Sequence, residues 1–275
     1  ETYLKQAKLS QFEFFSQYLI NQLELLPEPY RGLPLVVSGM ASANIGLKEL
    51  DYAPFPINIS GNGLNWKAVS LFNSSVLLLI SGAKSAQGMM RGEEIQAIGL
   101  GKYLGKENSS LLLLPGTHSK HLTYQQGYFT KLKTFMTGEV FEILSKKSIL
   151  SNSVAPANWN KLAKKPFLEG VLLGKDGKMT EQLFSVRARQ LNQQSLKSEN
   201  YFYLSGLLIG DELAYLQKVK ERIFLAASHP LDQMYQTALQ AIIPLEQQVY
   251  FDHNILDTCL LEGQLKILRN YEQTR

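Results

Sequence analysis

The sequence predicts an α/β fold with parallel sheets, divided into two domains. Short apolar runs at residues 33–38, 111–114 and 223–227 are bounded by breakers or polar residues, as expected for strands buried on both faces. Apolar residues at three- and four-residue spacing predict helices between and after these runs. Strands that alternate with helices are typical of a covered parallel sheet. The 275 residues allow one large domain or two, and we expect two.

Composition narrows the class of protein. The net charge is only +4, without basic runs, so a nucleic-acid partner is not expected. Cys259 is the only cysteine, which excludes an internal disulfide framework and fits a reducing cytoplasm. No signal peptide is recognisable, and no apolar stretch is long enough to span a bilayer, so we expect a cytoplasmic protein that is neither secreted nor inserted.

The first half of the chain opens on a predicted amphipathic helix over residues 3–26, followed by the strand at 33–38. Residues 69–72 and 76–80 are predicted to be paired strands, and a helix is expected from about Arg91 to Leu104. An α/β domain normally opens on a central strand. We therefore expect an N-terminal piece to precede Glu1.

The second half continues the alternation. A hairpin is predicted at 121–124 and 127–131, and helices are predicted at 137–149, 158–173, 181–194, 201–215, 231–242 and 255–268. The strands between them are expected at 223–227 and 249–251. The helices at about 155–200 are interpreted as a helical insertion.

The strand Leu111–Leu114 leads into the most informative segment, residues 116–120, which we call the phosphate turn. Gly116 lets the backbone come close to a ligand, Thr117 and Ser119 offer hydroxyl donors, and Lys120 supplies positive charge. The alternative is an ordinary turn. His118 is expected to donate a hydrogen bond, because no further ligand stands at zinc-site spacing from it.

Two other polar segments accompany strand ends or helix starts. The turn after residue 38 contains Gly39, which permits close ligand approach, and Asn44, which offers a donor and an acceptor to a polyhydroxylated molecule; a tight strand-helix connection is the alternative. Glu93 and Glu94 suit the positive end of the next helix and are explained equally well by capping. Arg91 opposes that dipole, so a substrate carboxylate is a plausible partner for it.

Gly206 and Gly210 interrupt a mostly apolar predicted helix. Each glycine costs about 1 kcal/mol of helix stability relative to alanine, so a close approach must compensate. Either a neighbouring helix or a nucleotide base would supply that approach.

Taken together, these segments resemble the 2-dehydro-3-deoxygalactonokinase family, bacterial kinases that phosphorylate 2-keto-3-deoxygalactonate. The resemblance extends from near the start to about Tyr235, and the order of the motifs is more specific than any one of them. The matching motifs are Ser38-Gly39-Met40 with Asn44-Ile45-Gly46, Met90-Arg91-Gly92-Glu93-Glu94, Pro115-Gly116-Thr117-His118-Ser119-Lys120, Met136-Thr137-Gly138-Glu139, Leu183-Phe184-Ser185-Val186-Arg187-Ala188 and Leu204-Ser205-Gly206-Leu207-Leu208-Ile209-Gly210.

The resemblance implies the sugar kinase, heat-shock protein and actin fold, with two ribonuclease-H-like domains around a cleft. A sugar-acid-binding domain would occupy residues 1–109, and a nucleotide-binding domain would occupy residues 110–275. The implied reaction is ATP-dependent phosphorylation of the 6-hydroxyl, with Mg²⁺ held through the ATP phosphates. Kinases of this type are also expected to form homodimers.

The resemblance implies the following site residues. The catalytic group is Glu93, with Glu94 as the alternative base and Arg91 to orient the sugar acid. The implied substrate-binding residues are Ser38, Gly39, Met40, Asn44, Thr137 and Glu139. The implied ATP-binding residues are Gly116, Thr117, His118, Ser119, Lys120, Gly206, Gly210 and Ser228.

Some features depart from the family. Its N-terminal Asp-Trp-Gly-Thr/Ser turn would lie before Glu1, and Ser228 stands where a glycine of the adenosine turn is expected. The loop between Gly82 and Met89 is short for the family. The alternatives are a kinase for another 2-keto sugar acid and a non-catalytic sugar-acid sensor. A hydrolase is disfavoured, since no G-x-S-x-G elbow occurs.

Overall fold

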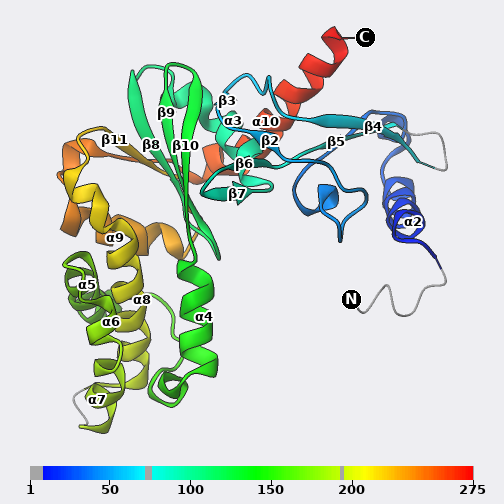
Figure 1. The fold of residues 1–275 in the computed structure, drawn as a ribbon. Coiled ribbons are helices and arrows are strands. Elements are labelled where there is room, and N and C mark those ends of the chain that lie inside the picture. Colours follow the sequence, from blue (N-terminus) through cyan, green and yellow to red (C-terminus); the bar gives the residue numbers. More distant parts are fainter. Residues whose placement is uncertain (1–8, 72–75, 193–194, 275) are drawn as a thin grey trace. The chain divides into compact units, whose positions relative to one another are not determined.

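The computed structural model describes residues 9–71, 76–192 and 195–274 (Figure 1). The chain forms two compact units, each described here by itself. Unit 1 consists of Glu1–Asn108, Tyr124–Leu132 and Asp257–Arg275, and unit 2 of Ser109–Thr123 and Lys133–Leu256. The chain first passes from unit 1 to unit 2 between residues 108 and 109, close to the boundary expected after residue 109. The C-terminal segment Asp257–Arg275, however, belongs to unit 1.

Unit 1 contains short strands, a helix at each end of its sequence and a buried helix between them. Its strands are β1 (Leu35–Val37), β2 (Ala53–Pro54), β3 (Ile57–Asn58), β4 (Trp66–Ser70), β5 (Val76–Ile80), β6 (Ala83–Ser85) and β7 (Gly88–Met90). Its helices are α2 (Gln11–Glu24), α3 (Glu93–Leu104) and most of α10 (His253–Gln273), with single 3-10 turns η1 (Glu28–Tyr30) and η2 (Gly39–Ser42).

The strands of unit 1 form mixed sheets. β1 is parallel to β5, whereas β4 is antiparallel to it. In the second sheet β2 is parallel to β6, and β7 is antiparallel to β6. The expectation of parallel sheets holds here only for the pairs β1–β5 and β2–β6. Strands that follow one another closely in the chain, β4 with β5 and β6 with β7, pair antiparallel, because parallel strands need a crossover connection of about a dozen residues or more.

The core of unit 1 joins α2 to the sheet β1-β5-β4. Ile20 and Leu23 on the apolar face of α2 pack with Leu77 and Leu79 of β5. Ser10 caps α2 in a capping box with Glu13, which explains where this helix begins. The predicted helix 3–26 is confirmed from Gln11 onward; its first residues, and residues 72–75 between the predicted paired strands, lie outside the described part of the chain.

Unit 2 combines a sheet with a helical bundle (Figure 1). Its strands are β8 (Ser109–Leu114), the start of β9 (Ser119–Gln125), the end of β10 (Tyr128–Phe135), β11 (Arg222–Leu225) and β12 (Gln248–Tyr250). Its helices are α4 (Thr137–Lys147), α5 (Lys161–Lys175), α6 (Met179–Gln182), α7 (Ser185–Leu191), α8 (Lys197–Leu213) and α9 (Leu231–Ile242), with 3-10 turns η3 (Ile149–Ser153), η4 (Ala214–Lys218) and η5 (Leu245–Gln247).

The sheet of unit 2 has the order β12-β11-β8-β9-β10. β11 is parallel to both β12 and β8, as the alternation of strands and helices predicted. β9 and β10 form the predicted hairpin, whose tip belongs to unit 1, where Phe129 of β10 pairs with Ile57 of β3. Leu112 and Leu113 of β8 have no exposed surface, which confirms a strand buried on both faces.

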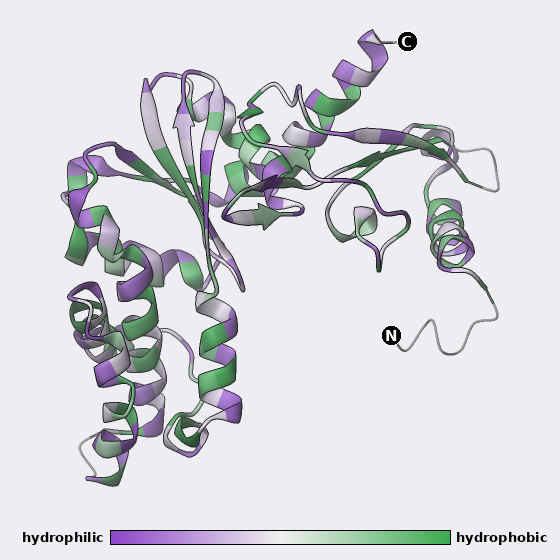
Figure 2. Cartoon of the chain, viewed as in Figure 1, coloured by the Kyte–Doolittle hydropathy of each residue, from purple (hydrophilic) through white to green (hydrophobic). Residues whose placement is uncertain are grey.

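The core of unit 2 lies between this sheet and the helices α5, α8 and α9. Figure 2 shows apolar and polar bands alternating along α4, the pattern of a helix with one face packed and one face in water. The expected helix at 181–194 is divided into α6 and α7, and residues 193–194 lie outside the described part. Among the described residues, no helix is both long and apolar enough to cross a membrane.

Candidate functional site

In unit 1 the structure brings two of the predicted polar segments together. Gly39 follows β1 with a φ of +76°, and Gly92 precedes α3 with a φ of +117°, both in the left-handed region that favours glycine. A Cβ added to Gly39 would lie 3.9 Å from Cα of Gly92. The turn after β1 and the start of α3 therefore form one backbone surface with little side-chain bulk.

Arg91 joins these two segments. Its Nη1 donates to the carbonyl oxygen of Ser42 and, at 2.7 Å, to Ser42 Oγ. Its Nε donates to the hydroxyl of Tyr52 at 3.2 Å, and its guanidinium carbon lies 4.0 Å from the centre of the Tyr52 ring. Arg91 therefore holds the turn after β1 in place, and this accounts for a cation that opposes the helix dipole.

The two acidic residues at the start of α3 have different surroundings. Both carboxylate oxygens of Glu94 accept from the backbone N–H of Gly92 at 2.8 Å, and the side chain is fully buried. Burial raises the pKa of Glu94 to about 7. Glu93 is only partly buried and accepts from the backbone N–H of Arg91 at 2.9 Å. Glu94 is thus a buried cap, and Glu93 is the carboxylate that retains access to solvent.

The remaining predicted substrate residues of unit 1 lie at the same end of β1. Ser38 Oγ accepts from Nε2 of Gln264 in α10 at 3.3 Å. Met40 is about half exposed, and Asn44 is exposed with its carbonyl oxygen held by Gln11. The side chains of Met40 and Asn44 are therefore accessible from solvent.

In unit 2 the phosphate turn connects β8 to β9 and lies against the start of α4. A Cβ added to Gly138 would lie 2.7 Å from the carbonyl oxygen of Gly116 and 2.7 Å from Cα of Thr117, so only glycine fits at position 138. By contrast, a Cβ added to Gly116 would meet no atom within 4 Å. The backbone of Gly116 is therefore open on one side, as close approach of a ligand requires.

Side chains also link the phosphate turn to the start of α4. His118 Nε2 lies 2.5 Å from a carboxylate oxygen of Glu139, and both side chains are partly exposed. The backbone N–H of Glu139 donates to the carbonyl oxygen of Thr117 at 3.1 Å. Thr137 and Glu139, grouped above with the substrate residues of the first domain, thus belong with the phosphate turn.

Two residues of the phosphate turn point inward. Ser119 is fully buried, and its hydroxyl lies 3.4 Å from the backbone N–H of Gly116. Lys120 is 3 % exposed, and its Nζ donates to the carbonyl oxygen of His118 at 2.8 Å. The ammonium group of Lys120 thus braces the turn itself, and its expected contact with the ATP phosphates stays a prediction.

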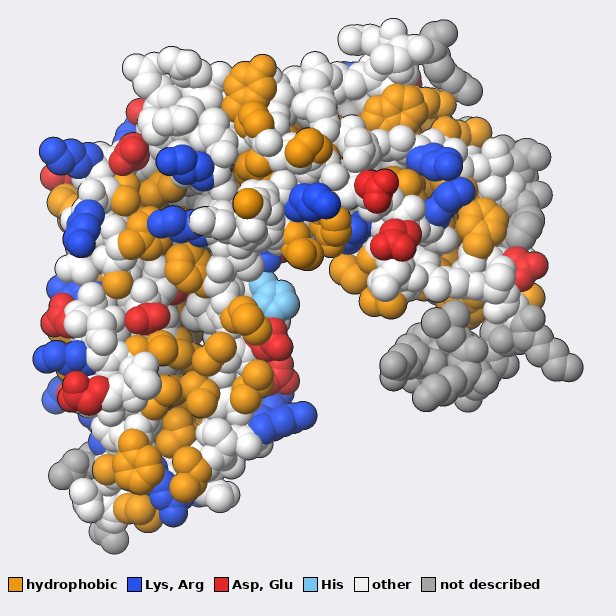
Figure 3. All heavy atoms as spheres, in the orientation of Figure 1, with side chains coloured by type: hydrophobic (Ala, Val, Ile, Leu, Met, Phe, Trp, Pro, Cys, Tyr) orange, Lys and Arg blue, Asp and Glu red, His pale blue; other side chains and the backbone are white. Residues whose placement is uncertain are grey.

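A cavity of about 390 Å³ opens beside Gly116. Ligand cavities of small molecules are typically about 300–1,000 Å³, so this volume suits a nucleotide base or a similar ring. Figure 3 shows hydrophobic side chains gathered over the helices of unit 2. The lining residues are Gly116, Thr137, Gly138, Phe141, Ala157, Asn158, Trp159, Tyr201, Phe202, Ser205, Leu208, Ile209, His229, Pro230, Leu231, Met234 and Tyr235.

Gly206 and Gly210 do not line this cavity. Cβ atoms added there would lie 2.1 Å from the carbonyl oxygen of Phe167 and 2.3 Å from that of Val171, both in α5. Of the two alternatives for these glycines, helix packing is the one observed, and neighbouring residues of α8 line the cavity instead. Ser228 also lies outside the lining, although the next two residues are part of it.

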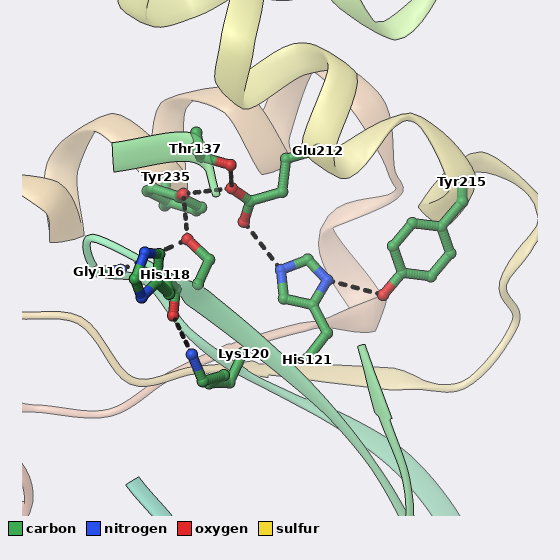
Figure 4. A network of polar contacts seen from close by, with 9 residues as sticks. Gly116, His118, Lys120, His121, Thr137, Glu212, Tyr215 and Tyr235 are labelled. Atoms are coloured by element: carbon green, nitrogen blue, oxygen red, sulfur yellow. Dashed lines mark hydrogen bonds and ion pairs between the residues drawn. The ribbon is translucent and has the colours of Figure 1, made fainter. Parts of the chain in front are cut away.

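A buried polar network behind the phosphate turn escaped the sequence analysis (Figure 4). The carboxylate of Glu212 accepts from Nε2 of His121 at 2.9 Å and from the hydroxyl of Tyr235 at 2.9 Å. It also accepts from the hydroxyl of Thr137, and Tyr215 lies 2.8 Å from the other nitrogen of His121. Two adjacent carboxylates, Asp211 and Glu212, near the end of a mostly apolar helix were the available signal. Sequence spacing could not identify its partners.

Metal ligation by protein side chains finds no support in the described residues. No group of three or more histidine, cysteine, aspartate or glutamate side chains there could hold a metal ion. His118 and His121 are each paired with a carboxylate, that of Glu139 and that of Glu212 respectively.

Comparison with known proteins identifies the family. The 2-keto-3-deoxy-galactonokinase family model matches residues 4–259. A probable 2-dehydro-3-deoxygalactonokinase of Rhizobium meliloti strain 1021 is 32% identical over 217 residues, which are 76% of this chain and 71% of that protein. The 2-dehydro-3-deoxygalactonokinase of Escherichia coli K12 is 30% identical over 213 residues, again 76% of this chain and 71% of that protein.

A solved structure agrees. The crystal structure of a candidate 2-dehydro-3-deoxygalactonokinase from Sinorhizobium meliloti superposes with a TM-score of 0.80 at 29% identity, over 93% of this chain and 84% of that one. The mixed α/β fold is thus shared with that protein. With a family match that spans most of its length, the chain belongs to the 2-keto-3-deoxy-galactonokinase family.

Proposed function

We propose that this chain phosphorylates 2-dehydro-3-deoxy-D-galactonate at its 6-hydroxyl, with ATP as the phosphoryl donor, in galactonate breakdown. Family membership and the names of the relatives support the kinase and its substrate. The structural observation that carries the proposal is the phosphate turn of unit 2, whose open Gly116 borders the cavity of about 390 Å³.

The geometry of unit 2 fits ATP. Gly116 and Thr137 line the part of the cavity next to the phosphate turn, where the open side of the Gly116 backbone allows a phosphate group to approach closely. Trp159, Tyr201 and Phe202 line the same cavity, and aromatic faces suit a purine ring. Thr117 is exposed on the turn, where its hydroxyl can reach phosphate oxygens, and the ammonium group of Lys120 holds the turn through the carbonyl oxygen of His118.

Unit 1 supplies the proposed sugar-acid site and the base. Asn44 and Met40 are exposed at the end of β1, and Arg91 organises that turn. Glu93 is the proposed general base that accepts the proton of the 6-hydroxyl, because its carboxylate is partly exposed. Glu94 is unsuited to this role, since its side chain is fully buried and bonded to Gly92.

Phosphoryl transfer needs positioning and charge neutralisation more than covalent help from the protein. Mg²⁺, when bound, would supply that neutralisation through the ATP phosphates. We further infer that each unit has a ribonuclease-H-like core, that the protein is cytoplasmic and that it forms a homodimer.

The experiment that tests this function measures ADP release by the full-length protein with Mg·ATP. The substrates compared are 2-keto-3-deoxygalactonate, its gluconate epimer and a no-sugar control. Turnover with the galactonate compound alone would support the proposal, and turnover with the epimer alone would point to another 2-keto sugar acid. Sugar-acid binding without turnover would favour the non-catalytic sensor.

A further inference from the structure

The carboxylate of Glu212 lies at the centre of unit 2 without contact to the cavity. Its side chain is 1% exposed, and it accepts hydrogen bonds from His121, Thr137 and Tyr235. A carboxylate in such a place is expensive, because it loses the hydration that it has in the unfolded chain. An apolar residue of similar volume often gives a protein equal or greater stability than a buried charge. The role of Glu212 is therefore more plainly the geometry that it imposes on its partners.

The three donors to Glu212 come from three different segments around the proposed nucleotide site (Figure 4). His121 stands on β9, directly after the phosphate turn. Thr137 is the first residue of α4, and Tyr235 belongs to α9; both of these residues line the cavity. One carboxylate therefore fixes β9, the start of α4 and the wall formed by α9 relative to one another.

The same carboxylate determines the direction of a hydrogen-bond chain that ends in the phosphate turn. The Tyr235 hydroxyl has one proton and donates it to Glu212, so the Ser119 hydroxyl, 3.2 Å away, must donate to the Tyr235 oxygen. Ser119 in turn accepts from the backbone N–H of Gly116. The orientation of the Gly116 peptide thus depends on a charge three hydrogen bonds away.

The other side of Glu212 is fixed as well. Tyr215 holds the second nitrogen of His121 at 2.8 Å, and Nζ of Lys133 lies 3.6 Å from the centre of the Tyr215 ring. Burial and then the charge of Glu212 raise the pKa values of Tyr215 and Tyr235, so both phenols stay protonated at neutral pH. The network therefore keeps one arrangement of donors.

We propose that Glu212 is the positioning residue of the phosphate turn: through Tyr235 and Ser119 it holds the Gly116 peptide, and through Thr137 it holds the start of α4, in the arrangement that receives the ATP phosphates. This inference rests on the proposed function for the identity of the ligand. The fixed turn itself follows from the contacts alone.

The test compares Glu212→Gln and Tyr235→Phe with a matched control, Tyr203→Phe. Tyr203 is also a buried tyrosine of unit 2, but its hydroxyl bonds to Ser185, outside the network and the cavity lining. Two readouts are taken: amide hydrogen exchange of residues 116–120 without nucleotide, and steady-state kinetics with Mg·ATP and the sugar acid.

We expect Tyr235→Phe and Glu212→Gln to accelerate exchange in the phosphate turn and to raise KM for ATP, each about tenfold, as the loss of one hydrogen bond would. The KM for the sugar acid should stay within about twofold, since the network lies in unit 2. Tyr203→Phe should leave both readouts at the wild-type level. If Glu212→Gln does not fold, Tyr235→Phe still decides the question.

A merely structural network would lower the melting temperature of Tyr235→Phe and leave turn exchange and KM for ATP as in Tyr203→Phe, and that result would overturn the inference. A wild-type protein that neither binds nor uses ATP would instead overturn the proposed function. The exchange readout would still judge the role of Glu212 in that case.

Discussion

The buried carboxyl group of Glu94 should make the stability of unit 1 depend on pH. Its pKa rises from 4.5 to about 7 because the side chain is buried, so the folded state binds the proton more tightly than the unfolded state. Between these two values the folded state holds more protons, and stability therefore falls as the pH rises. At 1.36 kcal/mol per pKa unit, the loss between pH 5 and pH 8 amounts to about 2–3 kcal/mol.

Replacing Glu94 by Gln should remove this dependence. In the native protein both carboxylate oxygens of Glu94 accept a hydrogen bond from the backbone N–H of Gly92 at 2.8 Å. The amide oxygen of Gln can still accept this hydrogen bond. Relative to wild type, the variant should therefore gain about 2–3 kcal/mol of unfolding free energy between pH 5 and pH 8. The direction of this change in stability with pH is specific to a buried carboxyl group, because an exposed ion-paired carboxylate would make the wild-type protein more stable as the pH rises.

The assay is urea unfolding at fixed ionic strength, followed by the fluorescence of Trp66 in a Trp159→Phe background. The chain has only these two tryptophans, so Trp66 then reports on unit 1 alone. Glu49→Gln, a change at an exposed carboxylate of the same unit, serves as control. If the difference between wild type and Glu94→Gln is the same at pH 5 and pH 8, the assignment of a buried, protonated Glu94 is refuted.

Three further outcomes are expected. Gly206→Ala should destabilise unit 2 by about 3 kcal/mol or more in thermal unfolding, because its Cβ would lie 2.1 Å from the carbonyl oxygen of Phe167. Gly116→Ala, by contrast, should leave stability nearly unchanged and raise KM for ATP. Equal melting temperatures for the two variants would contradict this contrast. Glu93→Gln should abolish turnover with ATP binding intact in calorimetry, and near-normal turnover would remove it as the base. Arg91→Lys should raise KM for the sugar acid several-fold, since lysine cannot reproduce the bonds to the turn after β1; an unchanged KM would argue against its role there.

Local patterns in the sequence were sufficient for several of the longer elements. The helix expected at 231–242 is α9 to the residue, and Leu112 and Leu113 are buried as an apolar run between breakers predicts. The phosphate turn is a connection between β8 and β9, next to a cavity that its glycine helps to line. In these cases the information lies within one window of the sequence, where periodicity and breakers act.

The features that the sequence left open depend on contacts between distant segments. Whether Gly206 faced a helix or a nucleotide could not be decided until α5 was seen against α8. The burial of Lys120 depends likewise on how β9 packs, and periodicity within the turn gives no sign of it. The partners of Glu212 stand 91, 75 and 23 residues away in the chain, spacings that no motif encodes.

The discontinuity of unit 1 has a consequence for how the protein is made. Gly99 and Gly263 are places where α3 and α10 touch backbone to backbone: a Cβ on Gly99 would lie 1.8 Å from the carbonyl oxygen of Cys259, and one on Gly263 would lie 2.1 Å from that of Ile95. The core of unit 1 therefore stays incomplete on the ribosome until α10 has been synthesised. Unit 2, whose residues 109–123 and 133–256 are all made before residue 257, can close its core first. The early segments of unit 1 thus reach their native packing only after the whole of unit 2 has been translated.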